Sequence, residues 1–563
     1  MKLNKYKAIL PAAALVLTMG LSSCMNDLDK GNINPNVEPS TPMLGLYSKC
    51  YAGLIMEGND GAADFSIDDA GKSTLLRNIF NFNELSTDES ICWWSDGGIV
   101  EIGENNCSAG HATLKFLYYR LMSNITYCNQ FLGIFSEDAD PARYAEVKFL
   151  RAYYYYLMLD FFGNPPFIAE ITTEAPKQAH TQYSEYDASK TYTREEQLEM
   201  GRKFMYSWIE KELIAAEAKM LDAKPEKENE ENYGRADKAA AWQLLSRLYL
   251  NAEVYTGAAQ WAKAKEYAEK VVKSDFKLFT GSAAPYTAYD MLFMGDNGTN
   301  GASVEAVLPL IQDGQSTRGW GGSLFFIASL WNDKMENVAG LGAGTTGNNW
   351  SGMRCRPELI AKFTSDPSSF VGLTTQDIRA LKIDDRALFW GQGSGNDERT
   401  LELGDNSSFY QGLTTTKWNN NYSNGASSHD SYDVDTDFFL FRAAEAYLNY
   451  VEADLRINGT LSDDALDKLN QIRERAHAAK FSSAASVSLE TILDERSREM
   501  YCEGLRRTDL IRFGQFGGND ATYKWSYKGG NINGVNFPAF RNVYPLPTSE
   551  LDANANLTQI AGY

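Results

Sequence analysis

Histidine is scarce in this chain, and the residue patterns of common catalytic sites are missing. Its 563 residues include four histidines, His111, His180, His429 and His477, and none belongs to an HExxH or similar cluster. There is no GxSxG, no Walker loop and no GxGxxG motif after a strand. Carboxylates are plentiful, which leaves a glycosidase pair open, but no pattern singles out two of them. The motifs therefore give no support for catalysis.

Cysteine is also sparse, and long hydrophobic runs are absent. No stretch reaches 18 apolar residues, so no transmembrane helix is predicted. The cysteines after residue 24 have no CxxC spacing, which argues against zinc, and they are too scattered for a disulfide framework. One or two bridges stay open among them. They are Cys50, Cys92, Cys107, Cys128, Cys355 and Cys502.

The N-terminus has the pattern of a bacterial lipoprotein. Three lysines precede an apolar run over residues 8–21, which is too short to span a membrane and ends in Leu-Ser-Ser before Cys24. We expect residues 1–23 to be a lipoprotein signal peptide, Cys24 to be lipidated, and residues 24–42 to be a tether. The alternative is a plain signal peptide with an accidental cysteine. Lipid is then the only membrane attachment that the sequence implies.

The chain is acidic, with a formal net charge of −21. This balance argues against nucleic acid and against anionic lipid head groups as partners. It favours a neutral ligand or a well-solvated surface. The length indicates two packed lobes rather than one simple domain.

Helical hairpins give the clearest structural signal. In residues 234–273, Trp242, Ser246 and Tyr249 share one helical face, and a second amphipathic helix follows the turn. The spacing matches the tetratricopeptide pattern, although the connection is about six residues longer than that consensus. An ordinary helical hairpin is the alternative. A similar face over residues 437–456 favours a short solenoid.

A mostly α fold is predicted, with a tetratricopeptide-like helical-hairpin scaffold and an irregular loop-rich lobe. Between about residues 278 and 435, Gly, Asn, Ser and Thr dominate and the periodicity fades. Further helices are expected over residues 43–60, 112–136, 141–162, 196–221, 462–478 and 488–507. The predicted domains are a scaffold with N-terminal loops (43–277), a ligand-binding lobe (278–435), and C-terminal helices and a tail that complete the scaffold (436–563).

Aromatic residues are abundant, at 12% of the chain, with 31 tyrosines and 11 tryptophans. Many lie in Gly/Asn/Ser-rich loops rather than on helical faces. A carbohydrate-binding surface needs such rings, because the apolar C–H face of a sugar stacks on them while its hydroxyls need polar partners. The alternative is that these aromatic side chains pack in the core, and this must be true of most of them.

Several motifs, in this order, resemble the SusD/RagB family of glycan-binding lipoproteins of Bacteroidetes. The resemblance covers nearly the whole chain, and the C-terminal Glu/Arg-rich motif is especially typical. Besides the lipoprotein pattern, the motifs lie at residues 83–89, 149–152, 162–166, 234–240, 442–447, 495–510 and 544–547.

The resemblance implies a tetratricopeptide-like half that supports a variable, ligand-holding half. It also implies a lipid-anchored protein on the cell surface at the outer membrane, which acts as a lid over a TonB-dependent, SusC-like transporter and does no chemistry on the sugar. We interpret the Arg/Glu clusters as ion-paired networks at helix ends rather than catalytic groups.

Within the family, the sequence is similar to the starch-binding prototype at candidate ligand-binding residues. Arg77 and Trp350 match prototype residues, and Trp320 stands where the prototype has a stacking tyrosine. Trp94 matches one member of a tryptophan pair in the prototype. Cys92 occupies the position of the other tryptophan in this chain.

Two further residues are ligand-binding candidates by the same comparison. Trp93, the neighbour of Cys92, is a candidate to compensate for the missing tryptophan. The prototype's contacting asparagine corresponds to Gly97, or to Asp96 if the loop shifts.

We expect the ligand to be starch or another α-1,4-glucan, because an arc of aromatic rings suits a curved chain better than a flat one. A different glycan, such as a fructan or a host glycan, is the alternative in the same class. A helical-toroid glycoside hydrolase and a tetratricopeptide adaptor for a protein segment are alternatives from other classes.

No cofactor is required, but a structural calcium ion is a candidate. Asp296, Asp435 and Asp437 supply oxygen ligands that calcium prefers, and the prototype is expected to carry an ion near these residues. The alternative is that Asp435 and Asp437 cap the following helix.

Overall fold

The computed structural model describes residues 42–57, 70–331, 335, 349–393, 399–404 and 408–563. The chain divides into two units, residues 1–46 and 47–563. The signal peptide and Cys24 lie outside the described residues. No helix in the described ranges combines the length and apolar character needed to cross a bilayer.

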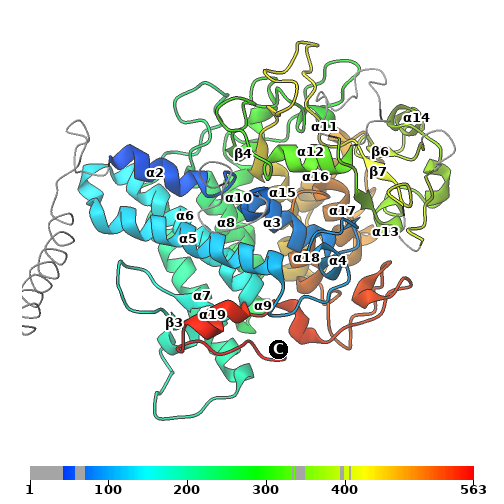
Figure 1. The fold of residues 1–563 in the computed structure, drawn as a ribbon. Coiled ribbons are helices and arrows are strands. Elements are labelled where there is room, and N and C mark those ends of the chain that lie inside the picture. Colours follow the sequence, from blue (N-terminus) through cyan, green and yellow to red (C-terminus); the bar gives the residue numbers. More distant parts are fainter. Residues whose placement is uncertain (1–41, 58–69, 332–334, 336–348, 394–398, 405–407) are drawn as a thin grey trace, which may run out of the picture. The chain divides into compact units, whose positions relative to one another are not determined.

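A succession of long helices forms the scaffold (Figure 1). Each contacts the next along the chain, and the last packs on α15 (Ala443–Asn458). The prediction of a mostly α fold is confirmed. These helices are α5 (Ala112–Ile134), α6 (Pro141–Phe162), α7 (Arg194–Glu217), α8 (Lys238–Leu250) and α10 (Trp261–Val272).

Local signals explain where α6 begins and ends. The Asp140 side chain accepts a hydrogen bond from the Arg143 amide (3.0 Å), and Pro141 occupies the first turn, where its missing N–H costs nothing. Gly163 follows the helix with a φ of 69°, a conformation that glycine adopts without a steric penalty. The sequence therefore predicted the bounds of this helix.

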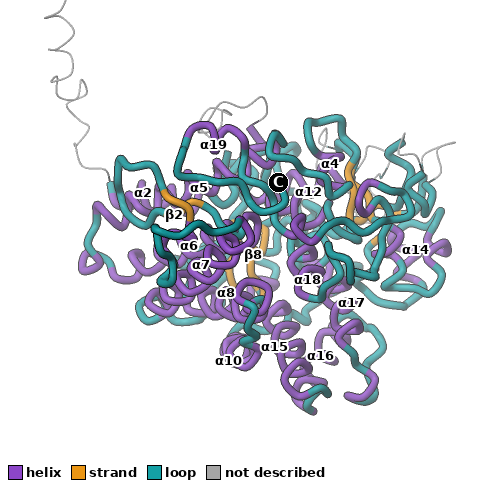
Figure 2. Tube along the Cα trace, turned by 90° about the horizontal axis from the view of Figure 1, so that it is seen from below, coloured by secondary structure: helices purple, strands orange, loops and turns teal. Residues whose placement is uncertain are grey.

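The hairpin of α8 and α10 depends on small residues. Ala264 and Ala268 are buried on α10, and the Ser246 hydroxyl of α8 donates to the Ala264 carbonyl (3.0 Å). Small side chains let these helices approach closely. Figure 2 shows α15 between α10 and α16 (Asp463–Arg475), and α15 contacts both of these helices.

Three predicted helices are wrong in part. The helix expected over residues 43–60 is α2 (Met43–Ala52), and residues 53–57 are not helical. Residues 438–442 form the strand β8 (Phe438–Arg442), which pairs antiparallel with β4 (Ala306–Leu310). The expected helix over 488–507 is two helices, α17 (Leu489–Met500) and α18 (Arg506–Arg512). Cys502 and Gly504 between them have positive φ angles of 59° and 80°, which end the first helix.

The remaining helices and strands are short. The helices are α2 (Met43–Ala52), α3 (Leu75–Phe80), α4 (Ile99–Gly103), α9 (Ala252–Thr256), α11 (Ala288–Met291), α12 (Ser323–Leu330), α13 (Pro357–Ile360), α14 (Thr375–Ala380) and α19 (Thr548–Ala553). The strands are β1 (Ser90–Cys92), β2 (Pro166–Phe167), β3 (Lys177–Gln178), β5 (Met353–Cys355), β6 (Phe389–Trp390) and β7 (Thr414–Thr415). Most elements between residues 278 and 435 belong to this short class, and loops connect them.

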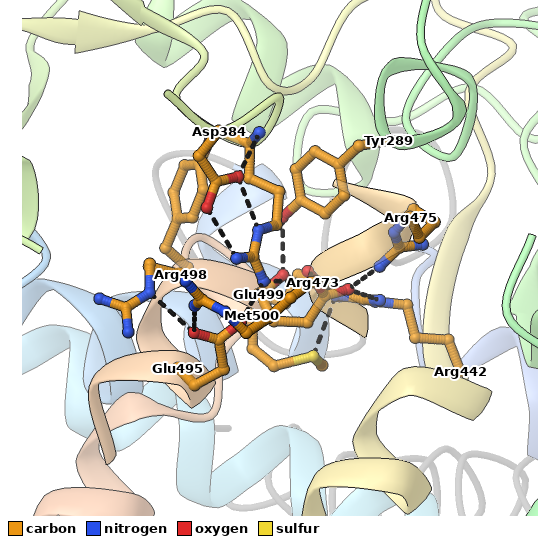
Figure 3. Close-up of polar contacts among 12 residues, drawn as sticks. Tyr289, Asp384, Arg442, Arg473, Arg475, Glu495, Arg498, Glu499 and Met500 are labelled. Carbon is orange, nitrogen blue, oxygen red and sulfur yellow. Dashed lines mark hydrogen bonds and ion pairs between the residues drawn. The ribbon is translucent and has the colours of Figure 1, made fainter. Parts of the chain in front are cut away.

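A buried ion-pair network ties the loop-rich region to the C-terminal helices (Figure 3). Arg386 pairs with Glu495 (2.9 Å) and Glu499 (3.1 Å) of α17, and Arg442 pairs with Glu499 (2.6 Å) and Glu305 (2.8 Å). These side chains are completely buried. The geometry agrees with the interpretation of the Arg/Glu clusters as structural.

All six described cysteines are free and buried, so no disulfide forms among them. Burial raises the pKa of the Cys92 thiol to about 12. Such thiols behave as small apolar side chains in the core.

Candidate functional site

Four aromatic rings from distant parts of the chain form a continuous row. The centroid distances are 6.2 Å from Trp94 to Trp350, 6.0 Å from Trp350 to Trp320, and 6.4 Å from Trp320 to Tyr432. Trp320 is 41% exposed and Tyr432 is 45% exposed, while Trp94 and Trp350 are half-buried. We call these four residues the aromatic row.

Trp94 is fixed from two sides. Its indole Nε1 donates to the Ser351 carbonyl (3.0 Å), and Gly352 approaches it so closely that an added Cβ would lie 1.9 Å from Nε1. On α3, the buried Arg77 guanidinium lies 4.6 Å from the Phe325 ring centre and 6.0 Å from that of Trp94. Arg77 therefore supports the Trp94 ring.

Trp320 stands on a loop with a defined conformation. The Asp313 carboxylate accepts hydrogen bonds from the amides of residues 315–317 at 2.6–2.9 Å. Burial would raise the pKa of Asp313, but these hydrogen bonds outweigh it and lower the pKa to about 2. The Trp320 amide donates to the Glu57 carboxylate, and a Cβ on Gly71 would lie 2.7 Å from the Trp320 Cβ. The contacts with Glu57 and Gly71 lie on the protein side of Trp320 and leave its ring exposed to solvent.

Trp350 is attached to the end of α12. Its amide donates to the Ala328 carbonyl (2.7 Å), and the next amide, of Ser351, donates to the Trp331 carbonyl (2.9 Å). Residues 336–348, which precede this segment, lie outside the described residues.

The structure brings Trp94, Trp320 and Trp350 together, and Arg77 touches the first of them. Trp93 instead packs edge-on against Tyr527, with 4.8 Å between ring centres. Asp96 lies on the loop after Trp94, with a carboxylate oxygen 3.9 Å from the Lys72 ammonium. Whether any of these residues binds a ligand stays a prediction.

Sequence comparison missed Tyr432, the fourth ring of the row. It lies in a Ser/Asp-rich loop more than 80 residues from Trp350 in sequence. The general excess of aromatics in polar loops was the only signal for it, since no local pattern connects it to the tryptophans.

The orientation of the rings restricts what the row can bind. Neighbouring ring planes are inclined by 62°, 33° and 89° along the row. A flat ligand cannot lie face-on against all four rings, whereas a curved chain can present successive faces to them. Sugar rings with apolar C–H faces are suitable partners for such side chains.

The three candidate calcium ligands differ in their surroundings. Asp437 is buried, which raises its pKa to about 8, and its Oδ2 accepts a hydrogen bond from the Tyr233 hydroxyl (2.5 Å). Asp435 accepts from the His429 amide (2.8 Å), and Asp296 from the Ser423 hydroxyl (2.6 Å).

These carboxylate oxygens are ligand atoms of the type that calcium prefers. However, each carboxylate already accepts a hydrogen bond from another protein group. Within the described ranges, no group of three or more His, Cys, Asp or Glu side chains is arranged to hold a metal ion. The helix-capping alternative for Asp435 and Asp437 is wrong, because β8 follows them and α15 begins only at Ala443.

Comparisons with known proteins agree on one family. The model of the SusD family matches residues 334–563. The starch-binding protein SusD of Bacteroides thetaiotaomicron is 36% identical, and the match covers 100% of both chains.

Solved structures share the fold at lower identity. The surface glycan-binding protein A from Bacteroides uniformis has a TM-score of 0.64 at 20% identity, over 92% of this chain and 99% of its own. A SusD superfamily protein from Parabacteroides distasonis has a TM-score of 0.63 at 20% identity, over 92% and 98%.

Proposed function

Because the chain belongs to the SusD family, we propose that it is a cell-surface protein that binds polysaccharide without cleaving it. The observation that carries this proposal is the aromatic row, in a chain that is similar over its full length to a starch-binding protein. Rings that are rigidly backed and partly exposed lose little conformational entropy when a sugar stacks on them.

Starch or another α-1,4-glucan is the ligand that the row supports best. The inclined ring planes favour a chain that curves, as α-1,4-linked glucose does. Stacking on a preformed curve needs few hydrogen bonds, so single sites bind weakly and long chains gain from repeated contacts. A fructan or a host glycan is the alternative ligand for the same surface.

The protein would act at the outer membrane, anchored only through lipid on Cys24. Its proposed partner is a TonB-dependent, SusC-like transporter that receives the captured oligosaccharide. The lipoprotein pattern and the family support this arrangement.

Replacing Cys24 by serine should move the protein from the membrane fraction to the soluble fraction, and unchanged membrane retention would contradict the anchor.

A structural calcium ion is the proposed cofactor at Asp296, Asp435 and Asp437. Its support is electrostatic. Burial has the largest effect on the pKa of Asp437, and the negative charges of Glu228 and Asp435 raise this pKa further. A divalent cation would relieve this repulsion.

Affinity electrophoresis tests the proposed function. The protein is run through gels that contain amylopectin, inulin or xylan, and reducing ends are assayed in parallel. We expect retardation by amylopectin alone and no new reducing ends. Retardation by inulin or xylan alone would contradict the α-glucan proposal, and release of reducing ends would contradict the binding role.

A further inference from the structure

Tyr432 continues the aromatic row past the three tryptophans. Its ring centre lies 6.4 Å from that of Trp320, and the side chain is 45% exposed. We propose that Tyr432 is a fourth glycan contact, which only a long and curved chain can reach while it also lies on Trp320 and Trp350. This inference rests on the proposed function, because it concerns the same surface.

The loop that carries Tyr432 has a defined conformation. Asp430 Oδ1 accepts hydrogen bonds from the amides of Tyr432 (2.7 Å) and Asp433 (3.0 Å). One side-chain acceptor that binds amides two and three residues ahead closes a tight turn. The ring is therefore presented by a formed turn.

Arg318 joins this turn to the loop of Trp320. It lies two residues before Trp320, and its guanidinium is 3.3 Å from the Asp433 carboxylate and 3.6 Å from that of Asp430. The arginine thereby links the backbone segments that carry the last two rings of the row. Exposed ion pairs contribute little to global stability, but a pair of this kind restricts where a loop can lie.

The angles of the row give Tyr432 a selective role. Trp350 and Trp320 are inclined by only 33°, so two neighbouring sugars of a gently curved chain can stack on both. The Tyr432 plane is nearly perpendicular to Trp320, at 89°. A chain that continues straight past Trp320 would miss the Tyr432 face, whereas a chain that turns would meet it. Tyr432 therefore distinguishes ligands by length and curvature together.

Calorimetric titration of the full mature chain in detergent tests this role. The ligands are maltotriose, maltoheptaose and cyclic maltoheptaose, and the variants are Tyr432→Ala and Tyr432→Phe. We expect Tyr432→Ala to weaken binding of both heptaoses by about five- to tenfold, the loss of roughly one stacking contact. Maltotriose affinity should change by less than about twofold, and Tyr432→Phe should retain the native affinities because it keeps the ring.

Tyr119→Ala is the matched control, since Tyr119 is a half-buried tyrosine on α5. It should leave all three affinities unchanged. Native heptaose affinity in Tyr432→Ala, beside a clear loss in Trp320→Ala, would overturn the inference. An equal loss for maltotriose and the heptaoses would overturn the selectivity. If the unmodified protein binds none of these glucans, the α-glucan proposal fails and the inference fails with it.

Arg318 is inferred to be a positioning residue, and a double-mutant cycle tests this. Arg318→Gln should weaken heptaose binding because it releases the turn, and adding it to Tyr432→Ala should cause no further loss. Additive losses would show that Arg318 contributes independently of Tyr432 and would contradict the positioning role.

Discussion

Tryptophans of this protein occupy two kinds of environment. Trp331 and Trp418 are almost fully buried, and Trp418 stacks on Phe438 at 5.1 Å with an interplanar angle of 10°. Trp320, in contrast, is exposed at the row. All three lie in the same loop-rich stretch of sequence, so composition alone could not separate core rings from surface rings.

Gly352 controls the position of Trp94. Its φ of 110° is strained for any other residue, and a Cβ would clash with the indole nitrogen at 1.9 Å. We predict that Gly352→Ala displaces Trp94, weakens amylopectin binding, and lowers the free energy of unfolding by about 1–3 kcal/mol. Urea unfolding and calorimetric titration measure the two effects.

Gly110→Ala is the control for this change. Its added Cβ would meet only the Ser108 hydroxyl oxygen, at 3.9 Å. Both its stability and its binding should match those of the unmodified protein. Native binding in Gly352→Ala would show that the position of Trp94 does not matter.

Motif matching placed three rings of the row in one neighbourhood but could not supply the fourth. The motifs around Trp94, Trp320 and Trp350 carry information from relatives, whereas Tyr432 reaches the row through a tertiary contact between two loops. Trp93 and Cys92 are adjacent in sequence, but successive side chains of an extended segment point to opposite sides. The Trp93 ring packs against Tyr527 instead.

At the scale of elements, long helices were predictable and short ones were not. Helix α10 follows a clear 3.6-residue pattern, and α6 has start and stop signals in Asp140, Pro141 and Gly163. The segment Phe438–Arg442 was predicted as helix because a short, mostly apolar run has no periodicity that separates strand from helix. Its pairing with β4 decided the outcome.

The Glu495 carboxylate on α17 makes stability depend on pH. Burial would raise its pKa, but Arg386, Arg498 and Arg473 lower the pKa from 4.5 to about 2. A depressed carboxyl pKa stabilises the fold above pH 4.5, and this contribution is lost as the pH falls toward 2. Glu495→Gln should therefore be less stable by about 2–4 kcal/mol at pH 7, with a gap that narrows below pH 4.5.

Urea unfolding of both proteins between pH 2.5 and 7 measures this gap. The comparison with the unmodified protein at each pH cancels the titration of other groups. A gap that stays constant over the whole range would contradict the assigned pKa of Glu495.

Arg442 is the central cation of the buried network. We predict that Arg442→Met lowers the free energy of unfolding by about 3–5 kcal/mol, because it leaves the carboxylates of Glu305, Glu499 and Glu503 partly unpaired in the interior. The matched control Lys203→Met breaks a surface pair with Glu199 and should change stability by less than about 0.5 kcal/mol. Equal effects of the two variants would contradict a structural role for the network.

For the whole molecule, the ligand surface depends on the joining of distant segments. Rings at positions 94, 320, 350 and 432 come from segments that are far apart in the sequence. Arg386 pairs with α17 and fixes part of the loop-rich region on the helices. The sequence predicted the mostly α scaffold from periodicity. It could not predict the angles between the rings, which follow from loop conformations held by glycines and side-chain acceptors.

Calcium, if bound at Asp296, Asp435 and Asp437, should stabilise the folded protein. We predict a Tm that rises by several degrees between excess EDTA and about 1 mM calcium, because the folded state alone presents the site. Asp435→Asn should abolish the rise. Identical melting with calcium and with EDTA would contradict the proposed ion.

The most direct test of the account is calorimetric titration of amylopectin and cyclic maltoheptaose into two variants and the unmodified protein. The first variant is Trp94→Ala/Trp320→Ala/Trp350→Ala, and the second is Trp261→Ala, a half-buried tryptophan on α10. We predict that the triple variant loses affinity by more than about tenfold while remaining folded, and that Trp261→Ala binds normally. Native affinity in the triple variant would contradict the claim that the aromatic row binds α-glucan.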